Sequence, residues 1–213
     1  MKRSLIVFGI VACAAAPTAI ADGYGLGVKA GTLGLGVEAT VAMTGRLNLR
    51  AGFNSYTYNY DETAGDVRYD ADLKLRSTAA IVDWHPFAGT FRFSAGLLSN
   101  KNGADLTATP TSSQTIGGVV YTPSQIGTLN GTVSFKKTAP YLGLGFGNAA
   151  AKSKGFGFSA ELGVLFQGKP DARLTSTGSV SQADLRAEEQ RIENDLDSLK
   201  TYPVLGVGLS YQF

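Results

Sequence analysis

The chain is poor in the residues that build thiol, disulfide and metal sites. Its 213 residues include one cysteine and one histidine, and only 17% are charged. So few ligands do not support a zinc site, a disulfide framework or a Cys-His nucleophilic pair. No run of basic residues alternates with aromatic ones, so nothing indicates nucleic-acid binding. We therefore expect no metal, no cofactor and no nucleic-acid partner.

Long hydrophobic runs are equally scarce. An apolar stretch at 5–16 is shorter than the roughly 20 residues that a membrane-spanning helix needs. Yet hydrophobic residues make up 44% of the chain, and glycine occurs 27 times. The mean hydropathy is +0.03. This composition is typical of a chain in which apolar and polar residues alternate, as they do in a transmembrane β-barrel.

The N-terminal segment has the pattern of a secretory signal peptide. Lys2 and Arg3 precede the apolar stretch, and Ala19 and Ala21 form a small-x-small cleavage site. We expect residues 1–21 to be removed, so that 22–213 form one barrel domain. Cleavage would remove two of the 19 basic residues. The mature chain would then have 17 basic and 17 acidic residues and no formal net charge.

Cys13 offers an alternative reading of the same segment. Residues 10–13 resemble a lipobox, in which Cys13 would become the lipidated first residue. We favour cleavage after Ala21, because that position directly precedes the first expected strand. The mature protein would then contain no cysteine.

The C-terminal segment has the pattern of a final barrel strand. Its residues of one parity are apolar or aromatic: Leu205, Val207, Leu209, Tyr211 and Phe213. The residues of the other parity are small or polar. Because successive side chains point to opposite faces of a strand, the first set would face lipid and the second the lumen. We interpret this strand as a signal for the barrel assembly machinery, which predicts the outer membrane of a Gram-negative bacterium.

Period-two alternation recurs along the rest of the chain. Short turns are expected at 44–46, 85–90 and 148–155, and long connections at 61–67, 100–136 and 168–201. Outer-membrane barrels have short periplasmic turns and longer outer loops. The pattern therefore predicts an all-β protein, a transmembrane antiparallel up-and-down β-barrel of eight strands. Residues 24–43 would be two strands, or one bent strand with a missing partner within 100–136.

The connection before the last strand contains a helical pattern. Ser181 and Asp184 resemble a capping box. Apolar residues then recur at helical spacing: Leu185, Ile192, Leu196 and Leu199. We expect an acidic helix at about 181–200, outside the cell and packed across the barrel mouth. It would stabilise the loop or act as a lid, and the alternative is a partner-binding helix.

Charged residues of both signs are expected to point into the lumen. They are Lys29, Glu38, Arg50, Asp70, Asp72, Lys74, Arg76, Arg92 and Glu161. Each must be paired or hydrated, because desolvating a lone charge costs several kcal/mol. They could form a salt-bridge network that fills the barrel, or a polar path for a charged solute. An eight-stranded barrel is just wide enough for side chains to fill it, whereas inward glycines would leave space.

The sequence shows no set of residues typical of a catalytic site, and we expect that the protein is not an enzyme. His85 lies in a Trp-His-Pro-Phe turn, where Trp84 and Phe87 resemble an interfacial aromatic girdle. We expect His85 to be a hydrated interfacial residue. An outer girdle would explain a second aromatic group, Tyr56, Tyr58, Tyr60 and Tyr69. A lipid-modifying barrel enzyme is a third alternative, but no catalytic triad is visible.

Several stretches resemble the ornithine-uptake (CarO-type) porins. They are Tyr69-Asp-Ala-Asp-Leu-Lys-Leu75, Ala139-Pro-Tyr-Leu-Gly-Leu-Gly-Phe146 and Gly163-Val-Leu-Phe-Gln-Gly-Lys-Pro170, followed by an acidic helical segment. The resemblance implies slow, weakly selective passage of small solutes, with basic amino acids among them. It assigns no substrate residue.

Two function hypotheses follow. The first is the passage of small solutes through the barrel. The second is a closed structural or surface-interaction barrel without transport. Under either hypothesis the expected partners are outer-membrane lipid, lipopolysaccharide and the barrel assembly machinery, with small solutes added under the first.

Overall fold

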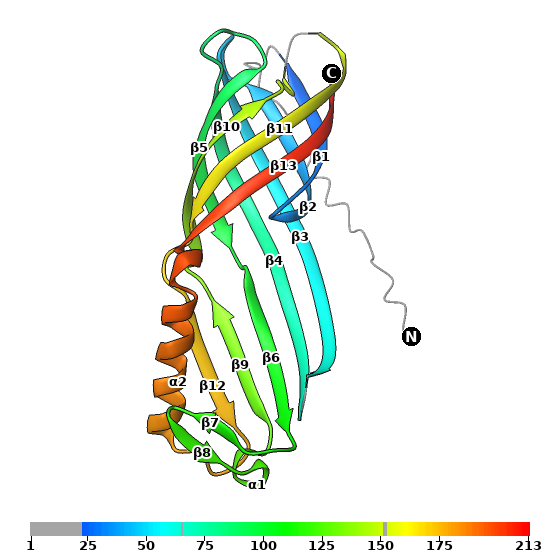
Figure 1. Ribbon diagram of the computed structural model, residues 1–213. Helices are drawn as coiled ribbons and strands as arrows, with labels where there is room; N and C mark the ends of the chain where they lie inside the picture. The colour runs from blue at the N-terminus through cyan, green and yellow to red at the C-terminus, as the bar shows by residue number, and fades with distance from the viewer. Residues whose placement is uncertain (1–22, 65, 151–152) are drawn as a thin grey trace.

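Antiparallel strands close into a ring, as Figure 1 shows. In the computed structural model, hydrogen-bonded neighbours follow one another as β4 (Val67–Trp84), β3 (Leu47–Ala64), β2 (Gly34–Ala42), β1 (Tyr24–Gly31), β13 (Thr201–Gln212), β11 (Gly155–Phe166), β10 (Thr138–Phe146) and β5 (Phe91–Asn100). β5 pairs again with β4, which closes the ring. The expected eight-stranded barrel is therefore confirmed.

The structure describes residues 23–64, 66–150 and 153–213. The expected signal peptide, its cleavage site at Ala19 and Ala21, and Cys13 lie outside these residues. Within them, no helix is both long enough and apolar enough to cross a bilayer.

Residues 24–43 form two strands rather than one bent strand. β1 and β2 make a hairpin around Thr32 and Leu33, and β1 also pairs with β13 from Gly25–Gln212 to Gly31–Gly206. The ring thus closes between the first and last strands of the chain. We call the end with the β2–β3, β4–β5 and β10–β11 connections the turn end.

The long connections contain strands and helices where loops were expected. Residues 100–136 include β6 (Gly103–Pro110), β7 (Gln114–Ile116), β8 (Val119–Tyr121), α1 (Pro123–Ile126) and β9 (Leu129–Ser134). Residues 168–201 include β12 (Asp171–Ser176), α2 (Gln182–Asp195) and the 3-10 helix η1 (Asp197–Lys200). The expectation of polar loops is wrong because these strands pair with a part of β4 that reaches beyond the ring.

These additional strands continue the barrel sheet on one side only. β6 pairs with the distal half of β4, from Lys74–Gly103 to Val67–Pro110, and β9 and β12 follow in turn. With the distal half of β3, they make a sheet in the order β3-β4-β6-β9-β12 that projects away from the turn end (Figure 1). We call this sheet and the helices packed on it the extension.

Around the ring, the outward side chains are apolar and exposed. Leu49, Val82 and Leu97 are examples, each more than 40% exposed. At the turn end, Tyr24 stacks on Phe213 with ring centroids 5.2 Å apart, and Trp84 stacks on Phe93 at 5.6 Å. An apolar belt with aromatic rings at its turn end is suited to a barrel wall that faces lipid.

The extension has the opposite polarity. On β3 the outward residues change from Leu49 and Phe53 to Thr57 and Asn59, with no change of register against β4. The inner face changes in the opposite sense, from Arg50 in the ring to apolar and aromatic residues. Those residues are Tyr56, Tyr58, Tyr60, Tyr69, Leu73 and Leu75. The outer side of the extension therefore suits water. Tyr56, Tyr58 and Tyr60 are 44–51% exposed but share the face of Arg50 rather than that of Phe53, so the expected outer girdle of tyrosines on the lipid-facing side is wrong.

The inner face of the extension has a hydrophobic core of its own. Ile116 and Tyr121 from the β7–β8 hairpin, Ile126 from α1 and Leu185 from α2 pack with Leu174 of β12, all at most 8% exposed. The hairpin and helices are short and could not bury this face alone. The sheet and its cover stabilise each other by removing apolar surface from water.

Helix α2 protects the free edge of the sheet. The Glu189 side chain accepts a hydrogen bond from the Leu174 backbone N–H at 2.7 Å, and Glu193 accepts one from Ala172 at 3.1 Å. These are alternate residues of β12, an edge strand whose unpaired groups would otherwise be open to another chain. Figure 1 shows α2 alongside β12 and in line with it, so the expected position across the barrel mouth is wrong.

The N-terminus of α2 agrees in part with the capping box expected at Ser181 and Asp184. Ser181 is the N-cap, and its hydroxyl accepts from the Ala183 N–H at 3.1 Å. Asp184 does not complete the capping box, because it accepts a hydrogen bond from the Tyr121 hydroxyl instead. The helix is therefore tied to the β7–β8 hairpin at the point where it begins.

Candidate functional site

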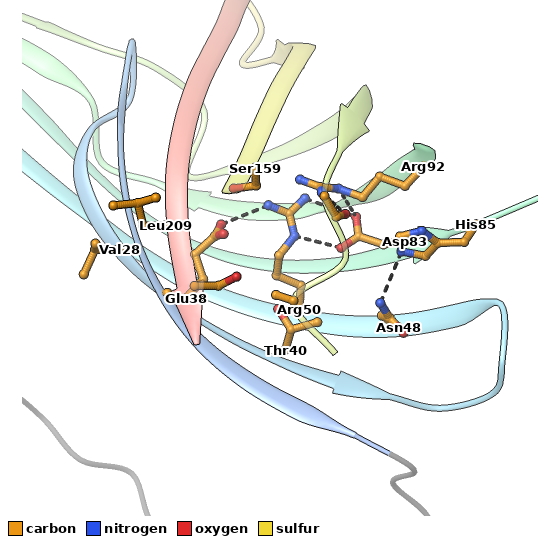
Figure 2. Close-up of a pocket in the computed structure, with 14 residues that line it drawn as sticks. Val28, Glu38, Thr40, Asn48, Arg50, Asp83, His85, Arg92, Ser159 and Leu209 are labelled. Atoms are coloured by element: carbon orange, nitrogen blue, oxygen red, sulfur yellow. Dashed lines mark hydrogen bonds and ion pairs between the residues drawn. The ribbon is translucent and has the colours of Figure 1, made fainter. Parts of the chain in front are cut away.

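The barrel interior contains a charged layer centred on Arg50. The Arg50 guanidinium donates to both carboxylate oxygens of Asp83, at 2.9 and 3.1 Å. Its Nη1 also donates to Glu38 at 2.9 Å and to Glu161 at 2.8 Å. One arginine on β3 thus joins carboxylates from β2, β4 and β11. Figure 2 shows Arg50 with Glu38 and Asp83. Bidentate, charge-assisted hydrogen bonds of this kind are among the strongest in proteins.

Two further cations balance the three carboxylates. Lys29 lies 2.7 Å from Glu38 and 3.2 Å from Glu161. Arg92 donates to the backbone oxygen of Gly147 at 2.6 Å, and its Nε lies 3.6 Å from an Asp83 oxygen. These ionic side chains are at most 13% exposed. Equal numbers of opposite charges allow a buried cluster of this kind to persist, because each ion has a partner.

A glycine makes room for Arg92. A Cβ atom on Gly145 would come within 2.8 Å of the guanidinium carbon of Arg92. A larger residue there would require the Arg92 guanidinium to shift. Inward glycines therefore accommodate large charged neighbours, rather than leaving an open path as the sequence alone allowed.

Toward the turn end, the charged layer meets a polar cluster around His85. His85 Nδ1 lies 2.8 Å from the Gly89 carbonyl oxygen, and its Nε2 lies 3.2 Å from Asn48 Nδ2. Nδ1 must donate to the carbonyl, so Nε2 accepts from the amide and the ring is neutral. Burial lowers the pKa of His85, which follows the strand-ending Trp84. The side chain is 1% exposed, so the expected hydrated histidine is wrong.

An apolar layer fills the half of the barrel nearer the extension. It is formed by inward residues of five ring strands together with Leu33 of the β1–β2 turn. They are Leu33, Ala79, Ile81, Leu98, Ala139, Tyr141, Leu165 and Val204, all at most 5% exposed. Tyr202 packs against this cluster. A solute moving along the barrel axis would meet this layer after the charged one.

Little space remains between these side chains. A cavity of about 20 Å³ lies among Glu38, Arg50, Asp83, His85 and Arg92, the group that Figure 2 displays. Such a volume holds about one water molecule. Among the described residues, the charged and apolar layers thus occupy successive levels of a narrow barrel, in agreement with the packing expected for eight strands.

The predicted lumen charges divide into two groups. Lys29, Glu38, Arg50, Arg92 and Glu161 lie together in the charged layer. The prediction is wrong for four residues of β4, Asp70, Asp72, Lys74 and Arg76, which lie on the outer face of the extension. Their parity is opposite to that of the buried Ala79, Ile81 and Asp83.

Asp83 is the interior residue that the sequence analysis missed. It makes the bidentate pair with Arg50 and also accepts a hydrogen bond from Ser94. A usable signal was present, because Trp84 was assigned to a lipid-facing girdle. An outward Trp84 requires an inward Asp83 and outward even-numbered residues along the whole of β4.

The residues of the predicted assembly signal lie on the outer surface of β13. Leu205, Val207 and Leu209 are each more than 50% exposed, and Tyr211 and Phe213 about 40%. Their recognition by assembly machinery remains a prediction. No group of three or more His, Cys, Asp or Glu side chains suited to a metal ion occurs among the described residues.

Comparison with known proteins supports the fold. No protein-family model matches the chain, and no curated protein matches it in sequence. Among solved structures it is similar to CarO2 of Acinetobacter baumannii, with a TM-score of 0.60 and 23% identity over 90% of this chain and 98% of that one. CarO of the same organism gives a TM-score of 0.58 and 24% identity over 89% and 97%.

A weaker likeness is found with Ail, the attachment invasion locus protein of Yersinia pestis. Its TM-score is 0.40 at 11% identity, over 90% of this chain and 94% of that one, which is too low to support an argument. The likeness to the two CarO structures confirms the resemblance expected from the sequence, and it concerns the fold. The chain has the architecture of an outer-membrane β-barrel.

Proposed function

We propose that this protein is a closed outer-membrane barrel of a Gram-negative bacterium that anchors the extension at the cell surface. The observation that carries the proposal is the filled interior, in which a charged layer and an apolar layer follow one another along the axis. The role is structural or one of surface interaction, and it requires no diffusive passage through the barrel.

The charged layer supports a closed barrel because each of its ions is paired with an ion of opposite charge in the same layer. A solute ion entering this level would have to replace the contacts of Arg50 with Asp83, Glu38 or Glu161, at 2.8 to 3.1 Å. Freeing one member leaves an uncompensated buried charge, which costs about 3–5 kcal/mol. Slow passage of basic amino acids would require this rearrangement for every molecule.

The apolar layer adds a second barrier of a different kind. Leu98 of β5 and Leu165 of β11 are at most 1% exposed and flank β10 within the same buried cluster. A charged solute would leave water without gaining a partner there. Opening one layer therefore leaves the other closed.

We assign no catalytic role to His85. Both of its ring nitrogens are engaged, one with Gly89 and one with Asn48. Its position between the charged layer and the turn fits a structural role. Lipid A mass spectra that change when the gene is deleted would contradict this part of the proposal.

Planar-bilayer conductance of the purified, refolded protein tests the closed barrel. We expect no current above the lipid background for the wild type, and none for Leu98→Ala or Arg50→Ala alone. A variant opened at both levels, Arg50→Ala with Leu98→Gly and Leu165→Gly, should conduct. Leu97→Ala is the matched control, because Leu97 is the neighbouring outward residue and is 55% exposed. This variant should give no current above the lipid background.

Steady wild-type conductance that increases with added basic amino acids would overturn the closed barrel and restore the passage hypothesis. The heat-dependent mobility of each variant in detergent gels should also be measured, so that a variant without conductance is known to be folded. Recovery of the intact wild-type protein from the soluble periplasmic fraction would overturn the location.

A further inference from the structure

The level at which the ring becomes the extension is rich in exposed basic side chains. Five of the segments that cross this level carry at least one of them. They are Lys74 and Arg76 on β4, Lys101 between β5 and β6, Lys136 and Lys137 between β9 and β10, Lys169 between β11 and β12, and Lys200 before β13. We call this set the basic belt.

Backbone hydrogen bonds hold the segments of the basic belt side by side. The Lys101 N–H donates to the Arg76 carbonyl oxygen at 2.8 Å, and the Asn100 N–H donates to that of Lys137 at 2.7 Å. The Lys136 N–H donates to Gln167 at 3.1 Å. The neighbouring Gly168 N–H donates to Lys200, also at 3.1 Å. The charges therefore follow one continuous path across neighbouring strands.

Few acidic groups neutralise the belt. Lys74 is paired with Asp105 at 2.5 Å, and Lys200 with Asp197 at 2.7 Å. The remaining members, Arg76, Lys101, Lys136, Lys137 and Lys169, make no ion pair with another described residue. Because the mature chain is expected to be formally neutral, this concentration of positive charge at one level is local rather than general.

The belt coincides with the boundary between lipid and water on the protein surface. The Arg76 guanidinium carbon lies 5.6 Å from the centroid of the Phe53 ring. Phe53 is the last aromatic residue of the apolar outer face of β3, and Thr57 and Asn59 follow it outward. Long basic side chains placed at such a boundary extend their charge into the headgroup region while their methylene groups cover apolar surface.

We propose that the basic belt binds the phosphate groups of the glycolipid in the outer leaflet, the phosphorylated lipid A part of lipopolysaccharide. This inference rests on the proposed outer-membrane location. Lysines supply point charges, and the Arg76 fork can engage two phosphate oxygens together. The site is one-sided, because the β1–β2 turn on the opposite side, Gly31-Thr-Leu-Gly34, contains no charge.

The acidic residues further out on the extension support a lipid over a polyanion in solution. Asp61, Glu62, Asp66, Asp70 and Asp72 lie at or toward the tip of the β3–β4 hairpin. They would repel an anion approaching from that side. A phosphate already in the membrane plane meets the belt first, so the charge pattern favours a ligand held at the headgroup level.

Binding of purified lipopolysaccharide to the full-length protein in detergent, measured at 0.15 M salt, tests the site. The belt variant is Lys101→Gln, Lys136→Gln, Lys137→Gln and Lys169→Gln. The control is Arg68→Gln, Arg173→Gln, Arg186→Gln and Arg191→Gln, which removes equal charge from the extension. Since basic residues near an anionic surface each strengthen binding to it, the belt variant should bind at least tenfold more weakly. The control should bind like the wild type.

Separate ligands identify the source of the phosphate. Lipid A with both phosphates should compete fully, whereas dephosphorylated lipid A should compete at least tenfold less well. Equal competition by the dephosphorylated form, or full competition by millimolar inorganic phosphate, would overturn the proposal. The first result would show a purely apolar contact, and the second an anion site indifferent to lipid.

The two proposals fail in distinguishable ways. Unaltered lipopolysaccharide binding by the folded belt variant would overturn the belt and leave the closed barrel untouched. Wild-type conductance or periplasmic recovery would overturn the proposed function, whatever the result for the belt variant.

Discussion

The ring and the extension share β3 and β4 but use opposite faces of them. In the ring, β3 points Arg50 inward and Phe53 outward. In the extension, the same strand points Tyr58 inward and Thr57 outward, with its register against β4 unchanged. The backbone sets which residues share a face, whereas the surrounding medium sets which face must be apolar. A change of polarity without a change of register therefore identifies the membrane boundary.

The two regions also bury different chemistry. The ring encloses an ionic cluster and an apolar layer, and the extension encloses an apolar core around Leu174 and Leu185. Lipid covers the outside of the ring, so its interior can be polar where charges are paired. Water covers the outside of the extension, so burial of apolar surface must supply its stability.

The largest expected effect comes from breaking the ionic cluster of the ring. Arg50→Ala leaves Asp83, Glu38 and Glu161 without their shared partner, and should lower the free energy of unfolding by about 3–5 kcal/mol. Urea unfolding in lipid vesicles, followed by the fluorescence of Trp84, the single tryptophan, measures it. Arg68→Ala on the outer face of the extension should leave the transition unchanged. Equal transitions for both variants would mean that the cluster does not stabilise the ring.

The next effect should be confined to the extension. Leu185 is 1% exposed in its core, and Leu185→Ala should destabilise it by about 2–4 kcal/mol through the lost contacts and the cavity left behind. Limited proteolysis of vesicle-inserted protein should then cut the extension faster, while the ring stays resistant. Leu199→Ala, at a side chain with 36% exposure, is the control. Simultaneous digestion of the ring would show that the two regions unfold as one.

A smaller effect is expected at the edge of the extension. Replacing Glu189 and Glu193 by alanine removes the acceptors of the Leu174 and Ala172 amides, at about 1 kcal/mol for each hydrogen bond. Hydrogen exchange at these two amides should accelerate about fivefold or more. Arg186→Ala on the same helix should not change it. Unaltered exchange would show that the helix protects the edge by packing alone.

The smallest effect concerns pH and the turn end of the ring. Burial lowers the pKa of His85 below its ordinary value near 6.5, so the folded state binds fewer protons there than the unfolded state. The stabilisation by neutral His85 is present above pH 6.5 and is lost as the pH falls through the folded-state pKa. Unfolding midpoints between pH 7.5 and 5 should therefore decline more for the wild type than for His85→Gln. Parallel declines would contradict this assignment.

The sequence predicts the ring better than the extension. Alternation along β2, β10, β11 and β13 is local and strong, because each strand faces lipid on one side and other side chains on the other. The same alternation in β6, β9 and β12 is built mostly from small and polar residues with one or two Leu or Val in each strand, and has the composition of a polar loop. Their partner is the distal half of β4, a contact between distant segments that no local pattern reveals.

The candidate site was predictable where a strand shows one clear alternation through the ring, as β1, β2 and β11 do and as the ring half of β3 does at Arg50. Lys29, Glu38 and Glu161 oppose lipid-facing neighbours along their own short strands. β4 runs through both environments, and its charged distal residues share the parity of Thr78 rather than of Ile81. The apolar inner residues Leu73 and Leu75 resembled a lipid-facing set, which reversed the assignment. Fixing the parity from Trp84 would have placed Asp83 correctly.

The pairing of β13 with β1 has a consequence for how this molecule is made. β13 supplies Val204 to the same buried cluster as Leu33. An assembly intermediate without β13 therefore has unpaired edges at β1 and β11 and lacks one side chain of the apolar layer. The extension consists of chain that precedes β13. Under the proposed location it crosses the membrane before β13 pairs with β1, and that pairing then holds the ring closed behind it.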